Sequence, residues 1–262
     1  MKRLLASLMF FGFLQMFSGA QAAQPPEPFH LFLLAGQSNM AGRGGLDEAG
    51  KTADERVWKW SREDRWEPAT EPIHRDKAGA GAGLAKSFAK ALTQADPALS
   101  VGLIPAACGG SPIAVWQPGA FFQQTKSHPY DDAVARTRAA LAGGGTLKAI
   151  LWHQGESDCS PRNAAVYEEK LRELITRFRT EFGNPELPFI IGQLGEFPGK
   201  EWSESHRTVD AAHRHLAATM PNVYFVSSEG LSDKGDKLHF STEALRTLGQ
   251  RYAERYLETE RK

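Results

Sequence analysis

Four short polar segments of the sequence carry side chains that could together perform acyl transfer. Each follows an apolar stretch, and the four are Gly36–Met40, Ala107–Ser111, Trp152–Asp158 and Asp236–Ser241. Between them they offer a serine hydroxyl, a histidine with a nearby aspartate, and several N–H donors. A nucleophile, a base, an orienting acid and oxyanion donors are the groups that ester hydrolysis through a covalent intermediate requires.

Ser38 is the candidate nucleophile. A tight turn directly after a strand would project its hydroxyl from the open end of a sheet. Gly36 and Gly42 permit such a turn, because glycine adopts backbone conformations that other residues avoid. The chain contains no Gly-x-Ser-x-Gly, so the nucleophile elbow of the α/β-hydrolases is not the match.

His239 is the candidate base. Asp236 precedes it by three residues, so its carboxylate can accept the Nδ1–H of the imidazole while Nε2 stays free to take a proton. His206, His213 and His215 lie on an amphipathic helical pattern, where we expect them to be solvated or half-buried. Their spacing matches no standard zinc site, and we expect neither a metal nor a cofactor.

The second and third segments supply donors for an oxyanion. Gly109 and Gly110 let the backbone approach a ligand closely and offer N–H groups, and the sequence leaves open which of the two points inward. Gln154 could add its side-chain amide, and Glu156 could pair with a histidine. Five polar side chains among the seven residues Trp152–Asp158 would be costly behind an apolar strand unless they are partnered or used.

Five short apolar runs predict buried parallel strands, because none alternates cleanly between apolar and polar residues. The runs are His30–Ala35, Ser100–Pro105, Ala149–Trp152, Phe189–Ile191 and Val223–Val226. Helical patterns cover Leu84–Leu92, Asp131–Leu141, Ser203–Thr219 and Thr242–Tyr256, and a further helix is capped by Ser160 and begins at Pro161. This alternation indicates a three-layer α/β/α domain on a mostly parallel, five-stranded sheet.

The stretch Arg43–Ala82 departs from this alternation. It is rich in Gly, Pro and charged residues and contains Trp58, Trp60 and Trp66. A long irregular insertion after the first strand would lie over the carboxyl ends of the strands, where sheets of this kind bind ligands. We expect most of these tryptophans to pack the insertion onto the sheet and one to line a cleft.

Residues 1–22 have the pattern of a secretory signal peptide. Lys2 and Arg3 precede the apolar stretch Leu4–Phe17, and small residues lead to Ala20-Gln21-Ala22. The apolar stretch is shorter than the roughly 20 residues of a membrane-spanning helix, and an uncleaved anchor is the alternative. We therefore predict a single domain over residues 23–262, exported to the periplasm or the cell exterior and free of the membrane after cleavage.

The two cysteines and the net charge bear on a possible disulfide and on the class of binding partner. Disulfides persist outside the cytoplasm, so Cys108 and Cys159 form either a bridge or two small buried thiols. The 31 basic and 31 acidic residues balance, which argues against a nucleic-acid partner because a surface that follows phosphates normally needs a basic excess.

Taken together, the segments resemble the SGNH hydrolase superfamily, and within it the group of carbohydrate esterase family 6 and the sialate O-acetylesterases. The resemblance rests on Gly36–Gly42, Gly109–Ile113 with Trp116, Trp152–Asp158 and Asp236–His239, with weaker similarity at Glu71–His74 and Gly81–Gly83. It implies a flavodoxin-like sheet and metal-free deacetylation of sugar esters. It also implies an acetylated carbohydrate as the partner.

Carried over to this chain, the resemblance implies a complete set of site residues. Ser38 would be the nucleophile and His239 the base. The oxyanion hole would combine the N–H groups of Ser38 and Gly110 with the side chain of Gln154, and Gly109 is the alternative glycine.

The resemblance leaves the acid and the sugar contacts less defined. Asp236 is the first choice for the partner of His239 because of its short spacing, and Glu156 is the second. Four residues of the matching segments would contact substrate: Asn39, His74, Trp116 and His153. The chain departs from the common pattern by placing Cys108 before the paired glycines, a change that concerns the shape of the substrate pocket.

We therefore predict a serine esterase that removes acetyl groups from O-acetylated carbohydrates, such as acetylated xylan or O-acetylated sialic acid, through an acyl-enzyme. A lipase or thioesterase of the same fold is one alternative, although the polar, tryptophan-rich stretch Arg43–Ala82 suits a sugar better. A carbohydrate-binding protein without catalysis is the other alternative, and the presence of every required group argues against it.

Overall fold

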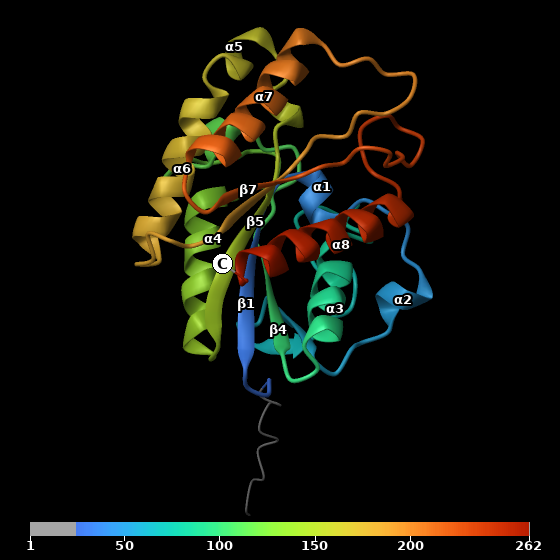
Figure 1. The fold of residues 1–262 in the computed structure, drawn as a ribbon, viewed down its shortest axis with the longest axis vertical. Helices are drawn as coiled ribbons and strands as arrows, with labels where there is room; N and C mark the ends of the chain where they lie inside the picture. The colour runs from blue at the N-terminus through green and yellow to red at the C-terminus, as the bar shows by residue number, and fades with distance from the viewer. Residues whose placement is uncertain (1–24, 262) are drawn as a thin grey trace, which may run out of the picture.

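A seven-stranded sheet runs through the centre of the computed structural model, which describes residues 25–261 (Figure 1). The strands lie in the order β3-β2-β4-β1-β5-β6-β7. In chain order they are β1 Phe29–Gly36, β2 Val57–Trp60, β3 Trp66–Pro68, β4 Ser100–Pro105, β5 Thr146–His153, β6 Phe189–Gly192 and β7 Val223–Val226. All neighbours pair in parallel except β3, which runs antiparallel to β2 at one edge.

The five predicted strands are present as β1, β4, β5, β6 and β7, but the prediction of a five-stranded sheet is wrong. The two additional strands come from Arg43–Ala82, which we expected to be irregular. β2 is Val-Trp-Lys-Trp and β3 is Trp-Glu-Pro, so a charged residue interrupts each short strand and neither forms a continuous apolar run in the sequence. Trp58, Trp60 and Trp66 lie on this hairpin and are buried, and the rings of Trp60 and Trp66 meet edge to face at 5.0 Å.

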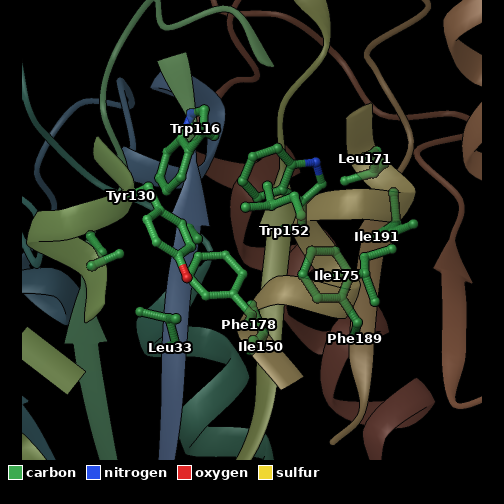
Figure 2. Packing of buried hydrophobic residues seen from close by; sticks show 14 of the residues in the cluster. Leu33, Trp116, Tyr130, Ile150, Trp152, Leu171, Ile175, Phe178, Phe189 and Ile191 are labelled. Atoms are coloured by element: carbon green, nitrogen blue, oxygen red, sulfur yellow. The ribbon is translucent and has the colours of Figure 1, made fainter. Parts of the chain in front are cut away.

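Helices cover both faces of the sheet. The longer ones are α3 Ala85–Ala95, α4 Pro129–Ala142, α6 Tyr167–Glu181, α7 Glu204–Thr219 and α8 Thr242–Thr259. Alternate residues of β1 point to opposite faces: Leu31 and Leu33 pack with α4, α6 and α7, whereas Phe32 and Leu34 pack with α3 and α8. Figure 2 shows the first of these two cores. The three-layer α/β/α arrangement follows directly from this alternation.

The helix expected to begin at Pro161 is two helices. The short α5 (Pro161–Ala164) ends before Val166, which lies outside the helical region at φ −116° and ψ 5°, and α6 begins at Tyr167. The break lets the buried Tyr167 hydroxyl reach Gln154, to which it donates at 2.9 Å. The four other predicted helices are present as α3, α4, α7 and α8, with ends shifted by up to three residues.

Three of the four polar segments begin side by side because of the strand order. β1 is central, with β4 and β5 as its neighbours, and in register Leu34 pairs with Pro105 and Gly36 with His153. The fourth segment follows β7 at the far edge, so the chain returns across the sheet before α8 begins at Thr242. The carboxyl edge of the sheet therefore gathers residues from distant parts of the sequence.

The membrane and export expectations concern the N-terminus. The predicted signal peptide, residues 1–22, lies outside the described residues, and export stays a prediction. Within residues 25–261 no helix is long and apolar enough to cross a membrane.

Candidate active site

Ser38 begins the short helix α1 (Ser38–Ala41) at the carboxyl end of β1. The turn before it contains Gly36 at φ +129°, where a Cβ would collide with the carbonyl group of His153 on the neighbouring strand. The backbone N–H of Gln37 donates to the same carbonyl at 2.9 Å. The close approach of β1 and β5 therefore requires glycine before the serine and fixes the position of Ser38.

A chain of hydrogen bonds joins Ser38, His239 and Asp236. The Oγ of Ser38 lies 3.1 Å from Nε2 of His239, and Nδ1 of His239 lies 2.7 Å from Oδ2 of Asp236. Because the carboxylate can only accept, Nδ1 carries the proton and Nε2 presents a lone pair to the serine hydroxyl. The structure thus brings together three residues that the sequence pattern selected, two of them 201 positions apart.

Asp236 is held in its ionised form by its own loop. Burial by itself raises the pKa of this carboxyl, but hydrogen bonds from the backbone N–H and imidazole of His239 and from the backbone N–H of Leu238 outweigh burial and lower the pKa to about 2. At neutral pH the group is an anion that can orient the imidazole and stabilise its protonated form.

Glu156, the alternative acid, is bonded elsewhere. It accepts a 2.6 Å hydrogen bond from Nδ2 of Asn39, and nothing in the described chain bonds it to His239. The same Asn39 amide donates to the carbonyl of Leu238 at 3.1 Å and accepts from the N–H of Phe240 at 3.2 Å. Asn39 therefore forms hydrogen bonds to the backbone on both sides of His239, and Glu156 orients the Asn39 side chain.

The structure distinguishes the two glycines proposed for the oxyanion hole. The N–H of Gly109 donates to Oδ2 of Asp76 at 2.8 Å, and Arg43 donates to the same oxygen at 2.7 Å. The N–H groups of Ser38 and Gly110 have no acceptor anywhere in residues 25–261, and Gly110 adopts φ +84°. Gly110 is therefore the glycine whose N–H is free for a ligand.

The side chain of Gln154 is already fully bonded to protein groups. Its Nε2 lies 2.6 Å from Oδ2 of Asp158, 3.0 Å from the carbonyl of Ser111 and 3.3 Å from Oε1 of Gln37. Its Oε1 accepts from the Tyr167 hydroxyl at 2.9 Å. The predicted role as an oxyanion donor does not fit this arrangement, because both amide hydrogens already point at protein acceptors. Gln154 instead connects the loops that follow β1, β4 and β5.

The four residues expected to contact substrate are buried. Asn39, His74, Trp116 and His153 are each at most 2% exposed. Trp116 donates from its indole to the Ser111 hydroxyl at 2.9 Å, and burial lowers the pKa of both His74 and His153. Their burial corrects the expectation of direct sugar contact. Asn39 and Trp116 hold the loops that surround Ser38 through hydrogen bonds, whereas neither ring nitrogen of His153 has a hydrogen-bond partner within residues 25–261.

Cys108 and Cys159 are free thiols, so the possible disulfide is not formed in the structure. The Sγ of Cys108 lies 2.9 Å from the hydroxyl of Thr125, and the Sγ of Cys159 donates to the carbonyl of Gly155 at 3.3 Å. Burial raises the pKa of both thiols, which keeps them protonated and unreactive at neutral pH.

A buried polar network beneath the site was not found from the sequence. His213, expected to be solvated or half-buried, is fully buried, with Nε2 lying 2.9 Å from the Tyr167 hydroxyl. Burial is the main cause that lowers the pKa of His213 to about 3, so it is neutral. Asp158 also accepts from the N–H of Ile113 at 2.8 Å. The density of polar residues at Trp152–Asp158 was the one sequence signal that pointed to such a network.

Comparison with known proteins agrees with this geometry at the family level. Residues 28–258 match the family described as "Carbohydrate esterase, sialic acid-specific acetylesterase". The chain belongs to this carbohydrate esterase family. As a member it is a carboxylic ester hydrolase, and the resemblance drawn from the four polar segments is confirmed.

Relatives of this carbohydrate esterase include plant and animal proteins. A protein named "Probable carbohydrate esterase" from Arabidopsis thaliana is 35% identical over 259 residues, which cover 89% of this chain and 92% of the relative. The sialate O-acetylesterase of Homo sapiens is 27% identical over 161 residues, which cover 51% of this chain and 30% of the human protein.

Solved structures share the fold of this carbohydrate esterase. An Arabidopsis thaliana protein superposes with a TM-score of 0.78 at 32% identity, over 89% of this chain and 99% of that one. NanS has a TM-score of 0.74 at 18% identity, over 91% and 99% of the two chains. A carbohydrate acetylesterase from Xanthomonas citri has a TM-score of 0.65 at 21% identity, over 86% of this chain and 55% of that one. The latter two likenesses show the fold alone.

Proposed function

We propose that this esterase removes acetyl groups from O-acetylated carbohydrates, of the acetylated xylan or sialic acid type, through an acyl-enzyme on Ser38. The single observation that carries the proposal is the unbroken hydrogen-bonded chain from Ser38 through His239 to Asp236. The names of the relatives support a sugar acetyl ester as the substrate. The N-terminal pattern supports export as the setting for such a substrate.

In the acylation step, Nε2 of His239 takes the proton of the Ser38 hydroxyl while Oγ forms a bond to the acetyl carbonyl carbon. The free N–H groups of Ser38 and Gly110 are suited to receive the resulting oxyanion. The bond from the carbonyl carbon to the sugar oxygen then breaks, and His239 returns its proton to that oxygen. Asp236 stabilises the imidazolium throughout.

In the deacylation step, His239 accepts a proton from water as the water oxygen attacks the acetyl-Ser38 ester. Collapse of the second tetrahedral intermediate releases acetate, and the proton returns from His239 to Oγ of Ser38.

The test is acetate release from acetylated xylan, O-acetylated sialic acids and simple acetylated sugars, with p-nitrophenyl acetate as a general substrate. We expect Ser38→Ala to abolish turnover on every substrate that the wild type hydrolyses. Ser160→Ala is the matched control, because the Ser160 side chain makes no capping hydrogen bond at the start of α5. Full activity in Ser38→Ala, or a wild type that releases acetate from none of these sugars, would contradict the proposal.

A further inference from the structure

A polar cavity of about 570 Å³ opens beside the candidate active site, and neither Ser38 nor His239 lines it. Its walls come from the β2–β3 hairpin, from residues 73–76 and 105–108, from the turn at residues 125–127, and from the start of α4 and Arg136 on that helix. The volume falls within the roughly 300–1,000 Å³ typical of small-molecule sites.

The cavity lies at the same carboxyl edge of the sheet as the triad. β4 separates β2 from β1 in the strand order, and the carboxyl ends of parallel strands are where such sheets bind ligands. Cys108 and Asp76 line the cavity, and the Asp76 carboxylate also accepts the N–H of Gly109, next to the free N–H of Gly110. One wall of the cavity is therefore continuous with the proposed oxyanion loop.

Positive charge predominates among the lining side chains. The lining holds five Lys or Arg residues and four Asp or Glu residues. Two of the four carboxylates are in ion pairs, Glu67 with Lys59 of the lining and Asp76 with Arg43 outside it. Within residues 25–261, four cations and two carboxylates of the lining then remain outside ion pairs, so the cavity has a surplus of positive charge.

Several of these cations have free donor capacity. The side chains of Arg75 and Lys126 make no hydrogen bond or ion pair with the described part of the chain, and Arg136 makes one hydrogen bond, to the carbonyl of Pro105 at 2.8 Å. Guanidinium groups bind carboxylates through parallel N–H donors and are favoured where such planar anions are recognised.

The histidine beside these cations is buried in the cavity wall. His74 lines the cavity and is 2% exposed, and its Nε2 lies 3.4 Å from the carbonyl of Leu34, to which it can donate. The Nδ1 of His74 is buried and has no partner within residues 25–261. The buried Nδ1 is out of reach of a ligand, so the neutral polar groups available to sugar hydroxyls are other side chains of the lining, among them Ser61, Thr125 and Ser127.

We propose that this cavity is a second binding site that takes the carboxylate of an acidic sugar. Arg75 and Arg136 hold the carboxylate, and the polar walls hold the ring hydroxyls. An acetylated chain could then place its acetyl ester at Ser38 and an acidic residue in the cavity, and this part of the inference rests on the proposed function. The site defines a preference for negatively charged carbohydrates, whether the acid is a uronate or a sialate.

The primary test measures binding without catalysis. Isothermal titration calorimetry on the wild type would compare sodium glucuronate, sodium N-acetylneuraminate, neutral methyl glucoside and sodium acetate at equal ionic strength. We expect at least one acidic sugar to bind with one site per chain, and the neutral sugar and acetate to bind at least tenfold more weakly. Binding of glucuronate alone identifies a uronate site, and binding of neuraminate alone identifies a sialate site.

Two variants connect that binding to the cavity. Removal of one charge-assisted hydrogen bond should weaken the acidic sugar about tenfold or more, so Arg75→Gln and Arg136→Gln should each do so. Arg207→Gln is the control, because Arg207 is an exposed arginine on α7 outside the cavity. The proposal is overturned if no acidic sugar binds, if methyl glucoside or acetate binds as well, or if both cavity variants keep wild-type affinity.

A kinetic measurement separates this inference from the proposed function. On an O-acetylated acidic sugar we expect Arg75→Gln and Arg136→Gln to raise KM, with unchanged kcat/KM on p-nitrophenyl acetate. If the wild type hydrolyses no acetylated sugar but binds acidic sugars through the two arginines, the proposed function fails and the second site stands. If the wild type releases acetate from acetylated sugars but calorimetry shows no binding that depends on the two arginines, the proposed function stands and the second site fails.

Discussion

Nδ2 of Asn39 lies 2.6 Å from Oε1 of Glu156, and this contact connects a glutamate to a histidine that it does not touch. The same amide bonds the carbonyl of Leu238 and the N–H of Phe240, the two residues that flank His239. Glu156 thus acts on His239 by orienting Asn39. Asn39 and Glu156 are therefore positioning residues for the base, His239, in the proposed mechanism.

Replacement of Asn39 should therefore lower kcat more than it changes KM. Asn39→Ala removes both contacts that hold the loop around His239, and a displacement of about 1 Å at a reacting group can cost roughly 100-fold in rate. The measurement is steady-state kinetics on p-nitrophenyl acetate, with the exposed Asn184→Ala as the control. An unchanged kcat in a folded Asn39→Ala protein would contradict the positioning role.

The roles of the two acids can be separated by isosteric replacement. Asp236→Asn should lower kcat by about 10⁴-fold, because the amide favours the wrong tautomer of His239. Glu156→Gln keeps an oxygen that accepts from Asn39, so its kcat should stay within about tenfold of wild type. The comparison uses kcat at pH 8 for both variants. A larger loss in Glu156→Gln than in Asp236→Asn would make Glu156 the acid partner of the base.

Gln154 should contribute to stability rather than serve as an oxyanion donor. Gln154→Ala leaves the buried carboxylate of Asp158 and the Tyr167 hydroxyl each short of a partner. Asp158 keeps the N–H of Ile113 and the Tyr167 hydroxyl keeps the backbone carbonyl of residue 154. We therefore expect the free energy of unfolding to fall by about 1–3 kcal/mol, the range of one lost buried hydrogen bond to a charged group. Denaturant titration measures the loss. Wild-type stability together with a 100-fold lower kcat would instead support the oxyanion role.

His213 should make the protein less stable as the pH falls. Burial lowers its pKa to about 3 in the folded chain, against about 6.5 when unfolded, so below pH 6.5 protons bind the unfolded chain preferentially. The contribution of His213 is complete above pH 6.5 and declines toward pH 3, with a slope of at most about 1.4 kcal/mol per pH unit.

The measurement is denaturant unfolding at several values between pH 7 and pH 4.5. His213→Gln should have a shallower dependence of unfolding free energy on pH than the wild type. His215→Gln on the same helix is the control, because His215 is exposed and bonded to Glu168. Equal slopes in His213→Gln and the wild type would show that His213 titrates alike in both states.

The sequence identified the reactive groups well because their spacing is local. Asp236 and His239 are three residues apart, and a loop of that length can join a carboxylate to Nδ1 in few ways. Ser38 could be found because a glycine turn after a buried strand has a recognisable pattern. The five strands β1, β4, β5, β6 and β7 were predictable because each contains a continuous apolar run, which is also a local pattern.

The supporting contacts could not be found in this way, because they depend on packing between distant segments. Asn39 and Glu156 are 117 positions apart, and no local pattern indicates that one amide will bond both Glu156 and the loop around His239. Similarly, polar density around Gln154 indicated that its side chain is used, but not whether it faces a ligand or Asp158. The β2–β3 hairpin was missed because a charged residue interrupts each of its short strands, whereas the four-residue strands β6 and β7 lie in continuous apolar runs.

The order of elements along the chain has a consequence for how activity appears during synthesis. Ser38 directly follows the central strand β1, and its base follows the last strand, 201 residues later. A ribosome-bound chain that already holds the serine, β4 and β5 still lacks a base. The proposed hydrolysis can therefore begin only after the segment that follows β7, which carries His239, has crossed the sheet. Esterase activity would then indicate that the fold is complete.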